Sequence, residues 1–191
     1  MQPAIILASA SPRRRQLLEQ IHADFSVIVP DIDETVLPGE KASGHVKRLA
    51  MTKAAAVDSH DADLVIAADT VLWFKGKILG KPSSEEDACA MLASLSGKRH
   101  TVYTGLAIMG RGAVSCTATK TAVYFRKLDR EQIISYVRRE VPFDCAGAYR
   151  IQDLGALLVR KIRGSFTNVV GFPLETLYRE ALQMGYDLLR G

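Results

Sequence analysis

The stretch from residue 4 to residue 18 constrains the fold of this chain more than any other. The apolar run Ala4 to Ala8 predicts a buried strand, and a turn of small polar residues follows it. Pro12 then opens a helix in which Leu17, Leu18 and Ile21 recur at helical spacing. A strand, a short turn and a helix in this order predict an α/β fold.

Three arginines, Arg13, Arg14 and Arg15, stand in the first turn of this helix. A helix N-terminus carries partial positive charge and favours acidic side chains, so cations there are electrostatically unfavourable unless an anion binds between them. A helix N-terminus with added guanidinium groups is typical of a phosphate-binding site. A solvated basic helix start is the alternative, and no glycine fingerprint decides between the two.

Composition favours an ordinary globular protein. The chain has 191 residues, of which 48% are hydrophobic and 24% charged, enough for one domain. No apolar run approaches the roughly 20 residues of a membrane span. The run Ala4 to Ala8 is too short for a secretory signal, and the basic cluster follows it instead of preceding it. We therefore expect a cytoplasmic protein with no membrane partner.

Cysteine usage and charge exclude further classes. The three cysteines contain no CxxC pair, which disfavours disulfides and a thiolate zinc site. The net charge of +4 suits acidic ligands. Aromatic residues are not interleaved with the basic ones, so the pattern disfavours nucleic acid as a partner.

A second apolar run, Leu64 to Ala68, stops at Asp69 and Thr70. Ligands of α/β sheets gather at the carboxyl ends of strands, which makes both residues candidates for a site. A hairpin with the turn Lys75-Gly76-Lys77 is predicted next, and its geometry should return Lys81 to a place beside Asp69.

The rest of the chain predicts alternating helices and strands without linkers or repeats. We expect a strand at 25–29, a helix at 43–57 capped by Ser43, a helix from a Ser83/Glu86 capping box to about 94, paired strands at 101–109 and 113–125, a helix capped by Asp129 to about 140, a strand at 157–162, and a helix after Pro173 to about 184.

Charged residues on these elements form one coherent set if they converge. Glu34 lies in the acidic loop 31–35, and carboxylates such as Glu34 and Asp69 suit Mg²⁺ or Mn²⁺ shared with substrate phosphates. Cations would neutralise phosphate oxygens, and a carboxylate could deprotonate water. The basic and polar members of the set are Arg13, Arg14, Lys53, Lys81 and Gln152. Such a set would perform phosphoanhydride hydrolysis, whereas scattered surface charges are the alternative.

Several motifs together resemble the Maf family over nearly the whole chain. They are Leu7-Ala8-Ser9, Ser11-Pro12-Arg13-Arg14, Asp31-Ile32-Asp33-Glu34, Arg48-Leu49-Ala50 with Lys53, Ala68-Asp69-Thr70, Gly80-Lys81-Pro82, Leu95-Ser96-Gly97, Ala146-Gly147-Ala148-Tyr149, Ile151-Gln152 and Asn168-Val169-Val170-Gly171-Phe172-Pro173. The resemblance implies one Maf-like domain over 1–191, with an elongated α/β fold similar to inosine triphosphatases. Its mixed, strongly twisted sheet would be flanked by helices, with two lobes around a cleft.

The resemblance also implies an activity. Family members are nucleoside triphosphate pyrophosphatases that use a divalent metal, Mg or Mn, and release a nucleoside monophosphate and pyrophosphate; they are often homodimers. Carried over by motif, the catalytic positions are Ser9, Arg14, Lys53, Asp69 and Lys81. Glu34 and Asp69 match the metal-binding positions, and Asp69 also matches the proposed proton acceptor.

Three further positions match those associated with substrate choice, namely Arg13, Thr70 and Gln152. They resemble the branch acting on dTTP and UTP, with modified pyrimidine triphosphates as further substrates. Arg15 and the loop 31–35 also resemble the 7-methyl-GTP branch, and Asp153 replaces a more usual glycine.

A non-catalytic regulator of cell division that binds nucleotides or nucleic acid is the competing class. Carboxylates repel phosphate unless a metal intervenes, so Glu34 and Asp69 favour the enzyme.

Overall fold

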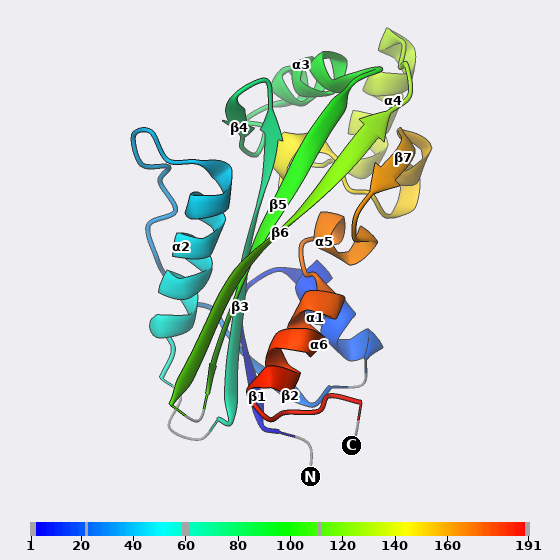
Figure 1. Cartoon of the computed structure of the whole chain (residues 1–191). Coiled ribbons are helices and arrows are strands. Elements are labelled where there is room, and N and C mark those ends of the chain that lie inside the picture. The colour runs from blue at the N-terminus through cyan, green and yellow to red at the C-terminus, as the bar shows by residue number, and fades with distance from the viewer. Residues whose placement is uncertain (1–2, 22, 59–61, 111, 190–191) are drawn as a thin grey trace. The chain divides into compact units, whose positions relative to one another are not determined.

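The chain is described by a computed structural model over residues 3–21, 23–58, 62–110 and 112–189. Its elements are β1 (Ile5–Ala8), α1 (Pro12–Gln20), β2 (Phe25–Ile28), α2 (Ala42–Ala55), β3 (Leu64–Phe74), β4 (Lys77–Leu79), α3 (Glu85–Leu95), β5 (Arg99–Gly110), β6 (Ala113–Phe125), α4 (Arg130–Glu140), the 3₁₀ turns η1 (Ala146–Ala148) and η2 (Asp153–Leu157), β7 (Val159–Arg163), α5 (Phe166–Val170) and α6 (Leu174–Gln183) (Figure 1).

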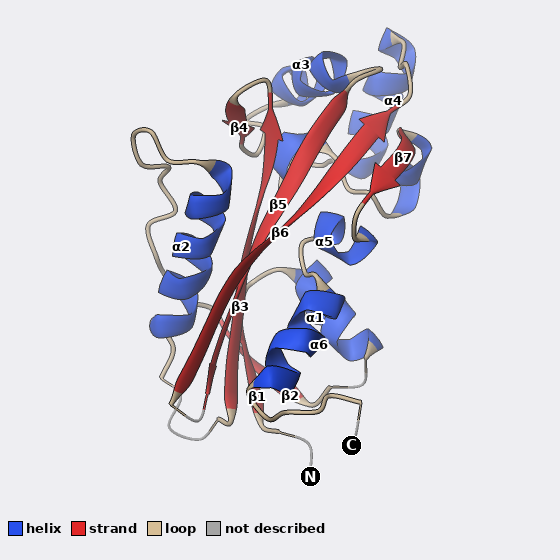
Figure 2. Ribbon diagram, in the orientation of Figure 1, coloured by secondary structure: helices blue, strands red, loops and turns tan. Residues whose placement is uncertain are grey.

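The strands form a twisted mixed sheet with helices packed on it (Figure 2). Within the described residues the sheet has seven strands in the order β2-β1-β3-β5-β6-β7, with β4 paired to β3. β1 runs parallel to β2 and to β3, whereas β4 runs antiparallel to β3 and β7 antiparallel to β6. The predicted α/β class and mixed sheet are therefore confirmed.

The chain divides into two compact units. The first comprises residues 1–69, 104–119 and 171–191, and the second comprises residues 70–103 and 120–170. Because the cuts fall inside strands, β3, β5 and β6 each contribute residues to both units. In the described ranges no helix is both long and apolar enough to cross a membrane.

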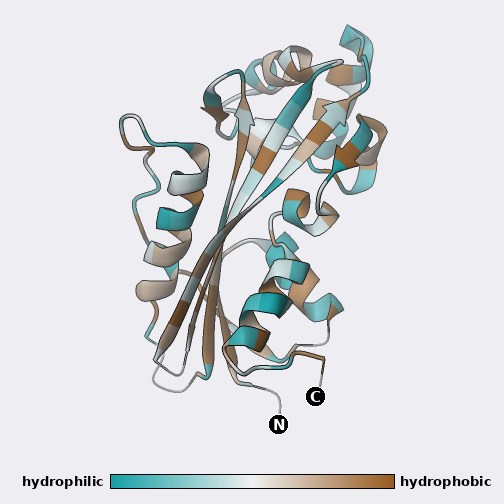
Figure 3. Cartoon of the chain, in the orientation of Figure 1, coloured by the Kyte–Doolittle hydropathy of each residue, from teal (hydrophilic) through white to brown (hydrophobic). Residues whose placement is uncertain are grey.

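The first unit is built on a core of small apolar side chains between α2 and the strands. Ile6 and Ala8 of β1 alternate with residues on the opposite face, and they pack with Ala50 and Ala54 of α2. At Gly105 of β5 a Cβ atom would lie 2.0 Å from a backbone oxygen of α2, so only glycine permits this close packing. The rest of α2 mixes hydrophilic and apolar residues (Figure 3).

The second unit contains helices α3 and α4 and an aromatic cluster. The rings of His100, Phe125 and Tyr149 meet edge to face, with centroids 4.8 to 5.4 Å apart. Burial lowers the pKa of His100 to about 4, and its Nε2 lies 2.8 Å from the Tyr149 hydroxyl. This cluster fixes the start of the segment that leads to Gln152.

Two of the predicted helix caps are wrong. α2 begins at Ala42 after Lys41, so Ser43 lies inside the helix. For α3 the cap is Ser84, whose Oγ accepts a hydrogen bond from the Asp87 backbone at 3.1 Å. Ser83 instead donates to the Asp87 carboxylate from its backbone and its hydroxyl, whereas Ser84 has the extended backbone that is typical of a cap.

Candidate active site

The turn after β1 holds Arg14 in place. Ser9 is buried there, and its Oγ accepts hydrogen bonds from the Ser11 backbone at 3.2 Å and from Arg14 Nη1 at 3.0 Å. Arg14 Nε donates to the Gly171 carbonyl at 2.9 Å. Two chain segments far apart in the sequence therefore fix the direction of this guanidinium at the start of α1.

The electrostatic neighbours of Arg14 belong to one group of charged residues, the charged cluster, which consists of Arg13, Arg14, Glu34, Lys53 and Asp69. Burial lowers the pKa of Arg14, the negative charges of Asp69 and Glu34 raise it, and the positive charge of Arg13 lowers it. These charges act on one another only because the tertiary structure brings α1, the 31–35 loop and β3 together in the first unit.

The arginine run at the start of α1 divides by position. Arg15 pairs with Glu19 one turn later at 2.8 Å, and both side chains are exposed. Arg13 and Arg14 lie beside each other, and the first turn of α1 contains no acidic residue. The cluster therefore includes Arg13 and Arg14, whereas Arg15 occupies the solvent-facing side of the helix.

Lys53 joins the two predicted metal ligands. Its ammonium lies 2.8 Å from Asp69 Oδ1 and 2.6 Å from Glu34 Oε1. Lys53 and Asp69 are buried, whereas the Glu34 side chain is about half exposed. One cation in the last turn of α2 thus holds a strand carboxylate and a loop carboxylate together.

The prediction that Asp69 and Thr70 end their strand is wrong. β3 continues to Phe74, which places both residues near its middle. The strand continues because Lys53 pairs with Asp69, and because Val71, Leu72 and Phe74 after it are apolar and buried. A charged residue within an apolar strand marks the position that α2 can neutralise, and it does not mark the strand end.

The donor chemistry of the cluster fits a small divalent cation. Glu34 and Asp69 offer hard oxygen ligands at one place, and Mg²⁺ is commonly bound by one or two carboxylates plus substrate phosphates. In the described part of the chain, no group of three or more His, Cys, Asp or Glu side chains is arranged to hold a metal. A cation here would complete its shell with phosphate and water oxygens.

The remaining predicted residues, Thr70, Lys81 and Gln152, belong to the second unit. The predicted hairpin is confirmed, with Leu72 opposite Leu79, and the same register continued beyond β4 would set Lys81 opposite Thr70. The Gly147 backbone donates to the Gly80 carbonyl at 2.9 Å, so the segment before Gln152 adjoins the residue before Lys81. Convergence of these residues with the first-unit cluster stays a prediction.

Sequence reasoning missed a second charged network in the first unit. Arg48 Nε and Nη2 donate to the two oxygens of Glu40 at 2.7 and 2.8 Å, and His45 Nδ1 lies 2.9 Å from the same carboxylate. The hydrogen bonds from Arg48 hold the pKa of Glu40 far below its ordinary value. Glu40 lies in the loop before α2 and Arg48 on α2, so neither helical nor strand spacing predicts that they pair. The only signal in the sequence was that Arg48 belongs to the motif Arg48-Leu49-Ala50.

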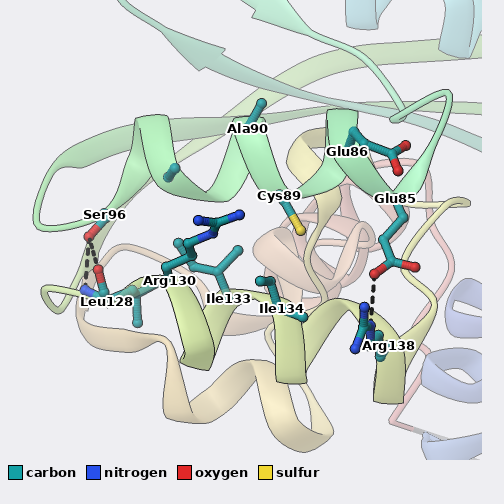
Figure 4. Close-up of a pocket in the computed structure, with 11 residues that line it drawn as sticks. Glu85, Glu86, Cys89, Ala90, Ser96, Leu128, Arg130, Ile133, Ile134 and Arg138 are labelled. Carbon is teal, nitrogen blue, oxygen red and sulfur yellow. Dashed lines mark hydrogen bonds and ion pairs between the residues drawn. The ribbon is translucent and has the colours of Figure 1, made fainter.

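A groove of about 630 Å³ lies between α3 and α4 (Figure 4). Cys89, Ala90 and Ile133 line its middle, and Glu85 and Arg138 form an ion pair at one end at 2.9 Å. None of the predicted site residues lines this groove. The chemistry expected from the sequence is therefore found in the charged cluster of the first unit and not in this cavity.

Comparison with known proteins decides the family. A family model described as Maf-like protein matches residues 4–184. The chain belongs to the Maf family. A relative from Caldicellulosiruptor saccharolyticus named dTTP/UTP pyrophosphatase is 41% identical over 194 residues, with 98% of each chain covered. A Bacillus cereus relative of the same name is 43% identical over 185 residues, covering 96% of this chain and 97% of its own.

Solved structures agree with the fold of this Maf-family chain. A HAM1 protein from Coxiella burnetii aligns with a TM-score of 0.53 at 16% identity, covering 96% of this chain and all of that protein. At this identity the likeness shows the fold alone. The family resemblance and the predicted mixed α/β fold, with a twisted sheet flanked by helices, are both confirmed.

Proposed function

We propose that this Maf-family protein hydrolyses dTTP and UTP to the nucleoside monophosphate and pyrophosphate, with modified pyrimidine triphosphates as further substrates. The observation that carries the proposal is the Lys53 ammonium held between the Glu34 and Asp69 carboxylates beside Arg14. Relatives named dTTP/UTP pyrophosphatase, aligned over nearly the full chain, support the substrate class.

In the proposed reaction, water attacks the α-phosphorus. A bond forms between the water oxygen and that phosphorus, and the bond to the bridging oxygen of the β-phosphate breaks. Asp69 accepts the proton of the water, and Lys53 orients the Asp69 carboxylate through the 2.8 Å contact. Pyrophosphate leaves with the bridging oxygen, so atoms and charge balance.

The triphosphate is bound by the cationic side of the cluster. Arg14, oriented by Ser9 and Gly171, points a fixed guanidinium at the phosphates, and the N-terminus of α1 adds backbone donors. Lys53 and Lys81 supply further positive charge. Glu34 and Asp69 would hold Mg²⁺ or Mn²⁺, which when bound neutralises phosphate charge.

Base selection is assigned to Arg13, Thr70 and Gln152. Thr70 and Gln152 can donate and accept hydrogen bonds, and Arg13 can donate them, which is what a site needs to distinguish uracil and thymine from purines. Thr70 and Gln152 are partly buried in the second unit, and Arg13 is partly buried in the first. The proposal also includes a cytoplasmic location and a homodimeric state. Light scattering on the purified protein tests whether it is a dimer.

The deciding experiment incubates the protein and Mn²⁺ with a panel of triphosphates and identifies both products. We expect consumption of dTTP and UTP with one pyrophosphate per monophosphate, and loss of turnover in EDTA. Release of orthophosphate with a nucleoside diphosphate would exclude the mechanism. Exclusive turnover of 7-methyl-GTP would exclude the substrate class, and salt-dependent DNA binding without turnover would favour the regulator instead.

A further inference from the structure

We propose that Arg48 is a positioning residue, which fastens the loop of residues 31–40 to α2 and so fixes the Glu34 carboxylate at Lys53. This inference rests on the proposed function for its kinetic consequence. Its structural part, the attachment of the loop, is independent of any activity.

The contacts of Arg48 reach the loop in its middle, at Thr35, and at its last residue, Glu40. Arg48 Nη2 donates to the Thr35 carbonyl at 3.0 Å, one residue after Glu34. The Arg48 guanidinium also binds both oxygens of Glu40, and the Glu40 carboxylate accepts a hydrogen bond from the Leu37 backbone at 3.1 Å. One side chain thereby ties the loop directly at Thr35 and, through Glu40, at Leu37.

The loop depends on such contacts because it has no regular secondary structure. Residues 29–36 form neither helix nor strand, and a short turn precedes α2. The Asp33 carboxylate accepts hydrogen bonds from the backbone and hydroxyl of Thr35 at 2.9 and 2.6 Å, which shapes the loop locally. These hydrogen bonds, and to a smaller extent the positive charge of Arg48, lower the pKa of Asp33. Glu34 lies between this local turn and the attachment point of Arg48.

The geometry favours a fixed attachment over a mobile surface pair. The side chains of Arg48 and Glu40 are 31% and 12% exposed, and two of the Arg48 nitrogens form a fork with the two Glu40 oxygens. A forked ion pair with one nearly buried partner loses less to solvent screening than a fully exposed pair does. Arg48 and Lys53 are both on α2, so the helix that holds the loop also carries the partner of Glu34.

Direct phosphate binding by Arg48 is the competing role, and a double-mutant cycle separates the two. If Arg48 acts through Glu34, Arg48→Ala lowers kcat/KM by roughly 10-fold to 100-fold in the wild-type background, the cost of a misplaced catalytic group. In a Glu34→Gln background the same change should cost less than about 2-fold, because the group it positions is already removed. An equal loss in both backgrounds would overturn the proposal.

Two further variants sharpen the cycle. Glu40→Gln leaves the Arg48 charge in place but weakens the fork, so positioning predicts a loss similar in direction to that of Arg48→Ala, whereas phosphate binding predicts none. Arg48→Lys retains the charge without the fork and should recover only part of the activity. Arg179→Ala is the matched control, because Arg179 also pairs with two carboxylates, Glu175 and Glu180, and none of these residues belongs to the charged cluster.

Hydrogen exchange tests the attachment without any substrate. Arg48→Ala should accelerate exchange of the Leu37 amide and its neighbours in the loop at least about 10-fold, while exchange in the middle of α2 stays unchanged. Unchanged loop exchange in a folded variant would overturn the proposal. If the wild-type protein turned over no triphosphate, the proposed function would be wrong. The exchange result would still show whether Arg48 attaches the loop to α2.

Discussion

Two ion pairs of nearly equal length differ in what surrounds them. Lys53 and Asp69 in the first unit lie 2.8 Å apart with side chains only 10% and 9% exposed, whereas Arg138 and Glu85 beside the α3/α4 groove lie 2.9 Å apart and are 69% and 43% exposed. An exposed pair contributes about 0 to 1 kcal/mol, whereas burying charges carries a desolvation cost. The buried pair therefore indicates the site better than the α3/α4 groove does.

The largest effect is expected from Asp69→Asn, which removes the proton acceptor with little change of shape. We expect kcat to fall by on the order of 10² to 10⁴. Steady-state kinetics with dTTP checks this, with a thermal melt to establish that the variant folds. An essentially unchanged kcat would mean that Asp69 does not accept the proton.

Lys53→Met tests whether the buried pair also matters for stability. The change leaves two carboxylates without the ammonium between them, so we expect a loss of about 3 kcal/mol in the free energy of unfolding and at least about 100-fold in kcat/KM. Urea titration measures the first. The double variant Lys53→Met with Asp69→Leu should recover stability but not activity, and recovery of both would contradict the assignment.

Gln152→Ala extends the comparison to the second unit. If Gln152 forms a hydrogen bond with the pyrimidine base, kcat/KM for dTTP should fall roughly 10-fold more than kcat/KM for a purine triphosphate. The reason is that losing this hydrogen bond affects only substrates whose base forms it. Competition assays with paired substrates measure the ratio. Equal losses for all bases would assign Gln152 to the triphosphate instead.

Arg138→Ala breaks the exposed pair and should do little. We expect a change of at most about 1 kcal/mol in the free energy of unfolding, and kcat/KM within about 2-fold of wild type. The same urea titration and dTTP assay apply. A loss as large as that of Lys53→Met would show that burial is not what separates the two pairs.

Ala90→Leu is the smallest perturbation, since it fills part of the α3/α4 groove from an exposed helix position. We expect kcat/KM within about 2-fold of wild type and unfolding free energy within about 0.5 kcal/mol. A strong loss of dTTP turnover would place the groove in the reaction and reverse the comparison.

Local patterns explain which structural predictions succeeded. Asp129 caps α4 and Pro12 begins α1, both as predicted, and the structure adds Gln132 as the second member of a capping box. The cap of α3 lies one residue after the predicted one because Ser83 and Ser84 have the same hydroxyl, and their different hydrogen bonds to Asp87 are seen only in the structure. Interactions between residues three or four positions apart can therefore be predicted from the sequence, whereas a choice between two adjacent serines cannot.

The sequence by itself determined the strand, turn and arginine-bearing helix at the start, the apolar faces of α1 and α2, and, through its motifs, the family and the candidate residues. Only the tertiary structure decided how the charges pair. Lys53 pairs with Glu34 and Asp69, Arg14 contacts Ser9 and Gly171, and Arg48 fastens the loop. Most of these partners are far apart in the chain, and backbone periodicity reports a face but not which element packs against it.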